Sequence, residues 1–178
     1  MVLEGVTKTL EQLFPMASGG PQNGLETGMG SGGEIVFVAA FSDGTSAVVV
    51  CDWMIANVIM KKAPLKKETT KWRSARSATK QRVFWSVQAR SVRAENHELN
   101  EELLEHIEKE LPTASGPVQW NMNWCAAQIG IADEGLRERC IALGERLGLY
   151  KDYPVSKGCT SPYLPIWIGS VVGKKGGR

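Results

Sequence analysis

Residues 98–111 read ELNEELLEHIEKEL, and this stretch carries the clearest structural signal in the chain. Its apolar side chains recur every three or four positions, at Leu99, Leu103, Leu104, Ile107 and Leu111. That spacing gathers them on one face of an α-helix, which is buried against a core. Pro112 follows directly and cannot continue a helix. The sequence therefore predicts a helix over residues 98–111.

The segment before this helix contains three runs predicted to be β-strands. Glu34–Phe41 and Ser46–Cys51 are rich in valine and flank residues 42–45, SDGT. An Asp-Gly step between such runs is typical of a hairpin turn. In Val83–Ala89 apolar residues alternate, as in a strand with one buried face. An amphipathic helix is expected earlier, over Val2–Phe14.

The segment after the helix is predicted to alternate again between strands and helices. Val118–Asn123 has the composition of a short strand, and a helix is expected from Trp124 onward. Asp133 is a suitable N-cap for a further helix, which Gly148 is expected to end. Ile166–Val172 favours a final strand. The predicted fold class is therefore α+β, a three-layer α/β/α arrangement. Its mixed sheet would have an N-terminal hairpin and flanking helices.

The chain length of 178 residues is that of about one domain, so residues 1–178 are expected to form a single domain. Seven glycines fall in residues 17–33, which predicts a flexible segment, and residues 173–178 are expected to be a mobile tail. No apolar run is long enough to span a membrane. The N-terminus lacks the features of a secretory signal, so we expect a cytoplasmic protein or one delivered without a cleavable signal. The sequence does not specify the oligomeric state.

Charge is strongly segregated along the chain. Residues 61–93 contain eleven basic residues and one acidic residue, a net charge of +10, whereas the whole chain has a net charge of +2. Seven glutamates follow within residues 95–110. Cations attract phosphate groups and aromatic rings stack on bases, so the basic segment favours a nucleic-acid partner. An acidic protein partner, a solvated surface and neutralisation by the chain's own glutamates are the alternatives.

Within the basic segment, Trp72 lies between two cations and is predicted to be an exposed stacking residue. The predicted nucleic-acid-binding residues are Lys71, Trp72, Arg73, Arg76, Lys80 and Arg82.

Residues 116–128, GPVQWNMNWCAAQ, suggest a different function. The predicted strand would lead into a helix start at Cys125, where the positive helix end lowers the pKa of a thiol. Here the chain resembles the cytidine-deaminase superfamily, in particular toxin-type nucleic-acid deaminases, whose first motif is His/Cys-Ala-Glu at a helix start. Cys125 and Ala126 match the first two positions, and Ala127 stands where the family has its glutamate.

The resemblance implies a zinc-dependent hydrolytic deaminase acting on nucleobases in nucleic acid. The zinc ligand would be Cys125, and Cys140 and Cys159 could complete a set of three thiolates. Without a carboxylate at Ala127, proton transfer from the zinc-bound water to the base has no carrier, which implies an inactive domain. The family's second motif, Pro-Cys-x-x-Cys, is missing.

Other interpretations of the cysteines and histidines remain open. Cys125 could be a small buried thiol that packs a helix, or a nucleophile that works without metal. His97 and His106 each stand four residues from a glutamate, so a helical metal site or a solvated acidic face is possible there. The four cysteines form no CxxC pair, which favours free thiols over two disulfides. The second functional hypothesis is a non-enzymatic module that binds nucleic acid or an acidic protein through residues 61–93.

Overall fold

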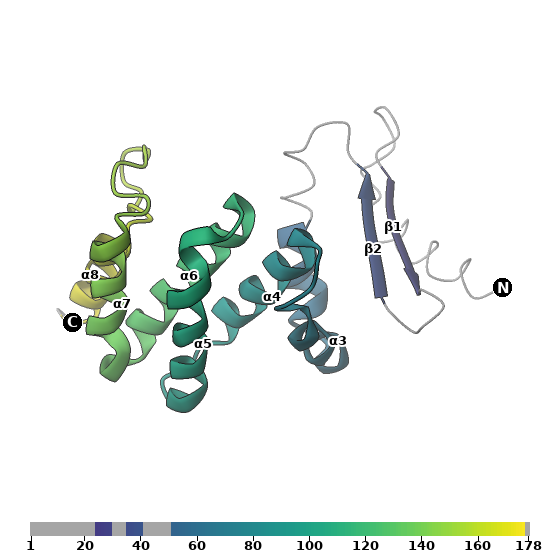
Figure 1. Cartoon of the computed structure of the whole chain (residues 1–178), viewed down its shortest axis with the longest axis horizontal. Helices are drawn as coiled ribbons and strands as arrows, with labels where there is room; N and C mark the ends of the chain where they lie inside the picture. Colours follow the sequence, from purple (N-terminus) through teal and green to yellow (C-terminus); the bar gives the residue numbers. More distant parts are fainter. Residues whose placement is uncertain (1–23, 30–34, 41–50, 177–178) are drawn as a thin grey trace. The chain divides into compact units, whose positions relative to one another are not determined.

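The computed structural model describes residues 24–29, 35–40 and 51–176, and it divides the chain into two compact units, Met1–Met54 and Ile55–Arg178. In the first unit, strand β1 (Gly24–Met29) pairs with strand β2 (Ile35–Ala40) in an antiparallel hairpin. The register places Gly24 opposite Ala40 and Met29 opposite Ile35. Figure 1 shows the two strands as neighbouring arrows.

The hairpin differs from the predicted one in its partner strand. The valine-rich run at 34–41 does contain a strand, β2, but it pairs with a segment assigned to the flexible 17–33 region. The predicted turn and most of the second predicted strand lie outside the described residues, and Cys51 is helical. Alternating residues such as Leu25, Thr27 and Met29 let β1 form a strand although two of its six residues are glycine.

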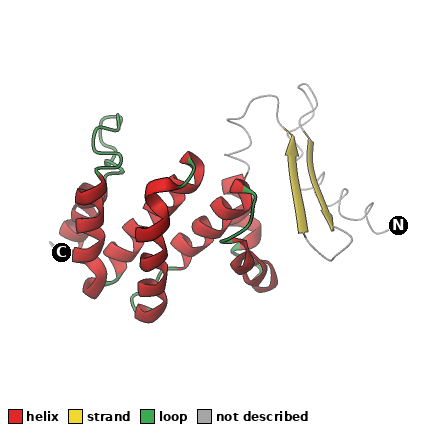
Figure 2. Ribbon diagram, viewed as in Figure 1, coloured by secondary structure: helices red, strands yellow, loops and turns green. Residues whose placement is uncertain are grey.

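The second unit is built from helices (Figure 2), and residues 51–176 contain no strand. The elements are η1 (Ile55–Ile59), α3 (Ala63–Thr69), η2 (Thr70–Trp72), α4 (Ala78–Ser91), α5 (His97–Glu110), η3 (Leu111–Thr113), α6 (Gly116–Ala132), α7 (Glu134–Leu147) and α8 (Leu164–Gly176). The predicted α+β class with a mixed sheet is therefore wrong, because α4, α6 and α8 occupy the runs at 83–89, 118–123 and 166–172. None of the helices in the described part is long and apolar enough to cross a membrane.

The helices that occupy these runs are buried on several sides, and such burial removes the sequence signal of a helix. In α4, six consecutive residues, Arg82 to Val87, are buried. A helix enclosed on several sides loses the 3.6-residue apolar period, and a short apolar run then fits a strand equally well. By contrast α5 buries one face and exposes glutamates on the other, and its predicted bounds are confirmed to within one residue. The predicted buried stripe is confirmed at Leu103, Leu104, Ile107 and Leu111 but is wrong at Leu99, which lies in the first turn and is 45% exposed. The tail predicted to begin at residue 173 is helical as far as Gly176.

Helix α6 lies at the centre of the helical unit and packs against α4, α5, α7 and α8. Its residues Met122, Cys125, Ala126 and Ile129 are at most 1% exposed. Small residues let the neighbouring backbones approach closely. At Gly130 an added Cβ would lie 2.6 Å from Ile168 Cδ1 of α8 and 3.0 Å from Cys140 Cβ of α7.

Two helix ends follow the sequence prediction. Asp133 caps α7, because its Oδ1 accepts a hydrogen bond from the backbone N–H of Gly135 at 3.1 Å. Gly148 ends α7 with φ of 62°, a left-handed conformation that glycine adopts without steric cost. Both the predicted N-cap and the predicted stop of this helix are confirmed.

The contact between α7 and α8 gives a test of this packing. An added Cβ at Gly144 would lie 2.7 Å from both Leu164 Cβ and Pro165 Cδ, atoms that cannot rotate away. We expect Gly144→Ala to lower the free energy of unfolding by about 1–3 kcal/mol, measured by urea denaturation. Gly169→Ala in α8 is the control, because nothing lies within 4 Å of its added Cβ. Equal effects of the two changes would contradict the described packing.

Candidate nucleic-acid interface

Residues 61–80 of the basic segment include α3, η2 and the N-terminal part of α4. Eight cations there have exposed or half-exposed side chains. All except Arg73 are called the α3–α4 basic residues: Lys61, Lys62, Lys66, Lys67, Lys71, Arg76 and Lys80. Lys66 and Lys67 lie in the last turn of α3, where cations interact favourably with the helix dipole. Arg76 and Lys80 flank the N-cap Ser77 of α4, where a cation opposes the dipole. The start of α4 is therefore a site of strong positive potential.

Few of these cations have an acidic partner. Lys71 Nζ lies 2.9 Å from Glu68 Oε2 in an exposed pair, and Lys61 Nζ lies 3.5 Å from the amide oxygen of Asn57. For Lys62, Lys66, Lys67 and Arg76 the described part of the chain offers no carboxylate within ion-pair distance. These four side chains are therefore available to an external anion.

The glutamates of α5 neutralise another part of the fold. Glu108 binds Arg139 of α7 through two hydrogen bonds of 2.8 and 2.7 Å, and Glu101 lies 3.4 Å from the same guanidinium. The hydrogen bonds from Arg139 lower the pKa of Glu108, despite the opposing effect of burial. The side chain of Arg73 reaches α5 from the basic segment, donating to Glu110 at 2.6 Å and lying 3.2 Å from His106 Nδ1. The self-neutralisation that the sequence left open as an alternative is therefore seen at Arg73.

Two of the predicted nucleic-acid-binding residues are buried. Trp72 and Arg82 are each 7% exposed, so the prediction of an exposed stacking ring at Trp72 is wrong. The η2 turn carries Trp72 inward, and Lys80 Nζ lies 5.6 Å from the ring centre. Lys71, Arg76 and Lys80 remain accessible, and Arg73 is held by α5. The cations at 61–67, absent from the predicted set, are accessible as well.

The structure does not place Cys125 at a helix start after a strand. It is the tenth residue of α6, fully buried, and Ala127 is fully buried beside it. Burial raises the pKa of Cys125, and the neighbouring Cys140 raises it further. Burial also raises the pKa of Cys140 to about 12, whereas Cys159 is exposed in the loop between α7 and α8. Protonated, buried thiols match the expectation of core packing.

The structure brings Cys125 and Cys140 together but leaves Cys159 exposed. Among the described residues no three His, Cys, Asp or Glu side chains are arranged to hold a metal ion. In the described part of the chain Cys125, Cys140 and Cys159 form no disulfide, as the sequence favoured.

Thiol labelling tests this arrangement. We expect a thiol reagent to modify Cys159 in the native protein and to leave Cys125 and Cys140 unmodified until the protein is unfolded, because thiolate formation and access are both suppressed by burial. Peptide mapping after labelling, with and without a chelator, is the measurement. If the chelator released Cys125, Cys140 and Cys159 together for labelling, the three-thiolate zinc site would be supported instead.

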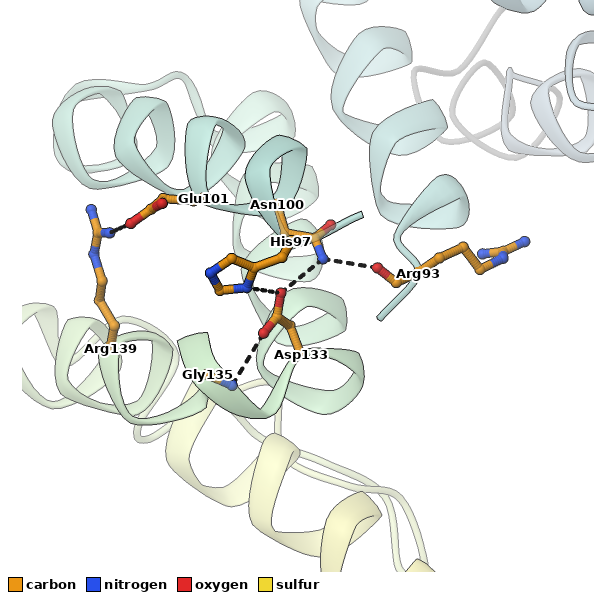
Figure 3. A network of polar contacts seen from close by, with 7 residues as sticks. All are labelled: Arg93, His97, Asn100, Glu101, Asp133, Gly135 and Arg139. Atoms are coloured by element: carbon orange, nitrogen blue, oxygen red, sulfur yellow. Dashed lines mark hydrogen bonds and ion pairs between the residues drawn. The ribbon is translucent and has the colours of Figure 1, made fainter. Parts of the chain in front are cut away.

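The two histidines are not brought together. His97 Nδ1 lies 2.9 Å from Asp133 Oδ2, and Asn100 Nδ2 donates to the same oxygen at 3.1 Å (Figure 3). Asn100 also donates to the backbone carbonyl of Arg93, so this network joins the end of α4 to α5 and the start of α7. His106 contacts Arg73 and Glu110 instead. The sequence indicated Asp133 as a helix cap, but nothing in the spacing linked it to His97.

The Asp133 network has a predictable pH dependence. Burial raises the pKa of Asp133, but hydrogen bonds from Asn100 and His97 outweigh it and lower the pKa overall. The carboxylate therefore stabilises the fold above the unfolded pKa of about 3.9, and this contribution is lost as pH falls through the lower folded pKa. We expect Asp133→Ala to reduce the free energy of unfolding at pH 7 by about 1–3 kcal/mol.

Urea denaturation at pH 7 and pH 3 measures this effect. The difference between the wild type and Asp133→Ala should shrink at pH 3, where the wild type is losing the same interaction. Asp152→Ala is the control, because Asp152 is exposed in the loop after α7. A difference that stays constant between the two pH values would refute the role of the ionised carboxylate.

No protein-family model, curated protein sequence or solved structure matches this chain.

Proposed function

We propose that this chain is a nucleic-acid-binding domain that holds phosphate groups with the α3–α4 basic residues. The observation that supports it most is the absence of counter-charge within the described residues around Lys62, Lys66, Lys67 and Arg76. An extended polyanion supplies several negative charges at a spacing that such a set can contact at once.

Two of the α3–α4 basic residues lie where their charge opposes a helix dipole, which supports a binding role. Arg76 and Lys80 add positive charge at the positive end of α4. A bound phosphate would offset this unfavourable interaction, and the free N–H groups at a helix start also favour an anion.

The deaminase hypothesis receives less support from the geometry. It requires a metal-bound water open to a flipped base, whereas Cys125 and Ala127 are both fully buried within α6. The binding hypothesis needs only accessible cations, and these are present. A non-enzymatic role is therefore the function we propose.

The test is a triple variant, Lys62→Ala, Lys67→Ala and Arg76→Ala, in the full chain. We expect weaker binding to a labelled oligonucleotide and a plot of log affinity against log salt whose slope is smaller by about 2–3, because about three phosphate contacts are lost. Fluorescence anisotropy at several salt concentrations measures both quantities.

The matched control replaces Lys109, Arg146 and Lys174, which are also exposed, by alanine. It changes the net charge equally, so it separates a localised interface from a general charge effect. Equal losses in both triple variants would contradict the proposed interface. Binding of poly-glutamate in preference to every oligonucleotide would favour the acidic-protein alternative.

A further inference from the structure

A second surface in the helical unit carries exposed aromatic rings. Trp120, in the first turns of α6, is 38% exposed and Tyr153, in the loop after α7, is 47% exposed. The centres of their rings lie 5.6 Å apart, and Tyr150 lies 5.2 Å from Trp120 and 5.9 Å from Tyr153. Large exposed aromatic rings gathered at one place are typical of a binding surface.

The loop is held in a specific shape that brings these rings together. Tyr150 has φ of 62°, a conformation that bulky residues rarely adopt, and its hydroxyl lies 3.4 Å from the Gln119 side-chain oxygen on α6. The loop also carries exposed Lys151, Asp152 and Lys157, so its net charge is positive. The tyrosines are therefore positioned beside Trp120 by both the backbone and side-chain contacts.

The aromatic surface continues along α6 toward an arginine. Trp124 lies four residues after Trp120, so the two indoles share one face of the helix. The guanidinium of Arg90, from α4, lies over the Trp124 ring with its carbon 4.6 Å from the ring centre. We call Trp120, Trp124, Tyr150 and Tyr153 the aromatic row.

Arg90 has unused hydrogen-bonding capacity. Its Nε is buried without a partner, and no carboxylate in the described part of the chain pairs with it. One turn earlier on α4, the hydroxyl of Ser86 is also buried and unpartnered. Arg90 as a whole is half-buried, and the two terminal Nη groups of a guanidinium suit the bidentate binding of a phosphate.

We propose that the aromatic row is a stacking platform for unpaired bases, with Arg90 binding a phosphate of the same strand. This inference rests on the proposed function and narrows its ligand to single-stranded nucleic acid. Bases in a duplex are already stacked on each other, whereas unpaired bases can lie on aromatic rings. Arg90, Lys151 and Lys157 add the positive charge that a phosphate backbone requires and that a proline-rich peptide would not.

The experiment compares a 20-mer of oligo-dT with a duplex of equal length, using the full chain. The double variant Trp120→Ala, Tyr153→Ala should bind the single strand about tenfold or more weakly, with its duplex affinity unchanged. Trp120→Phe should restore part of the affinity, because it keeps a stacking ring. Leu99→Ala together with Ile166→Ala is the control, since both residues are exposed apolar side chains on other helices.

Arg90 is tested separately. Arg90→Ala should weaken single-strand binding and reduce the salt slope by about 1, whereas Arg90→Lys should keep the slope and lose part of the affinity. Urea denaturation of each variant checks that it folds. In the wild type, tryptophan fluorescence should be quenched by oligo-dT more than by the duplex.

The outcomes separate this inference from the function on which it rests. Equal affinity of the wild type for both oligonucleotides, or unchanged binding in Trp120→Ala, Tyr153→Ala, would overturn the stacking platform. The α3–α4 basic residues would keep their role if their triple variant still lost affinity. Quenching by a proline-rich peptide but not by oligo-dT would assign the row to a peptide and overturn the inference. Absence of binding to both oligonucleotides would refute the proposed function itself.

Discussion

The burial of α6 is the constraint on which the helical unit depends. Its side chains are enclosed by α4, α5, α7 and α8, and residues such as Cys125, Ala126 and Ala127 have no exposed surface. Small side chains at these positions permit close approach of the surrounding helices, and protein interiors tolerate little change of volume at such contacts. The cysteine that resembled a deaminase ligand therefore contributes to packing at the centre of the unit.

Polar interactions then fix how the helices around α6 are joined. Asp133 connects α6 to α7, as the C-cap of the first helix and the N-cap of the second. Its two carboxylate oxygens contact the side chains of His97 and Asn100 from α5 and the backbone N–H of Gly135 from α7 (Figure 3). Arg139 holds the acidic face of α5 against α7. Because a buried carboxylate is stable only when its hydrogen bonds are satisfied, this junction orients three helices at once.

The ion pairs of the α5 glutamates also explain how charge is distributed over the helical unit. Most of the α5 glutamates with an ion-pair partner face Arg139, and one holds Arg73. The cations of α3 and of the start of α4 are left without counter-charge in the described residues. The Arg90 guanidinium lies over the Trp124 ring, and its buried Nε has no hydrogen-bond partner. Accessible cations near helix starts and exposed aromatic rings are the two elements that single-strand binding combines.

Helix α5, both ends of α7 and the accessibility of most cations of residues 61–80 could be predicted from local sequence features. These features are the apolar period of 98–111, the capping residue Asp133, the glycine at 148 and a run of lysines. The helical state of Val83–Ala89 and of the run before Cys125 depends instead on tertiary contacts, because enclosure on several sides removes the period that distinguishes a buried helix from a strand. Tertiary contacts also determine which aromatic rings are exposed. Trp72 is turned inward, whereas Trp120 meets tyrosines thirty or more positions away, a contact that no local pattern encodes.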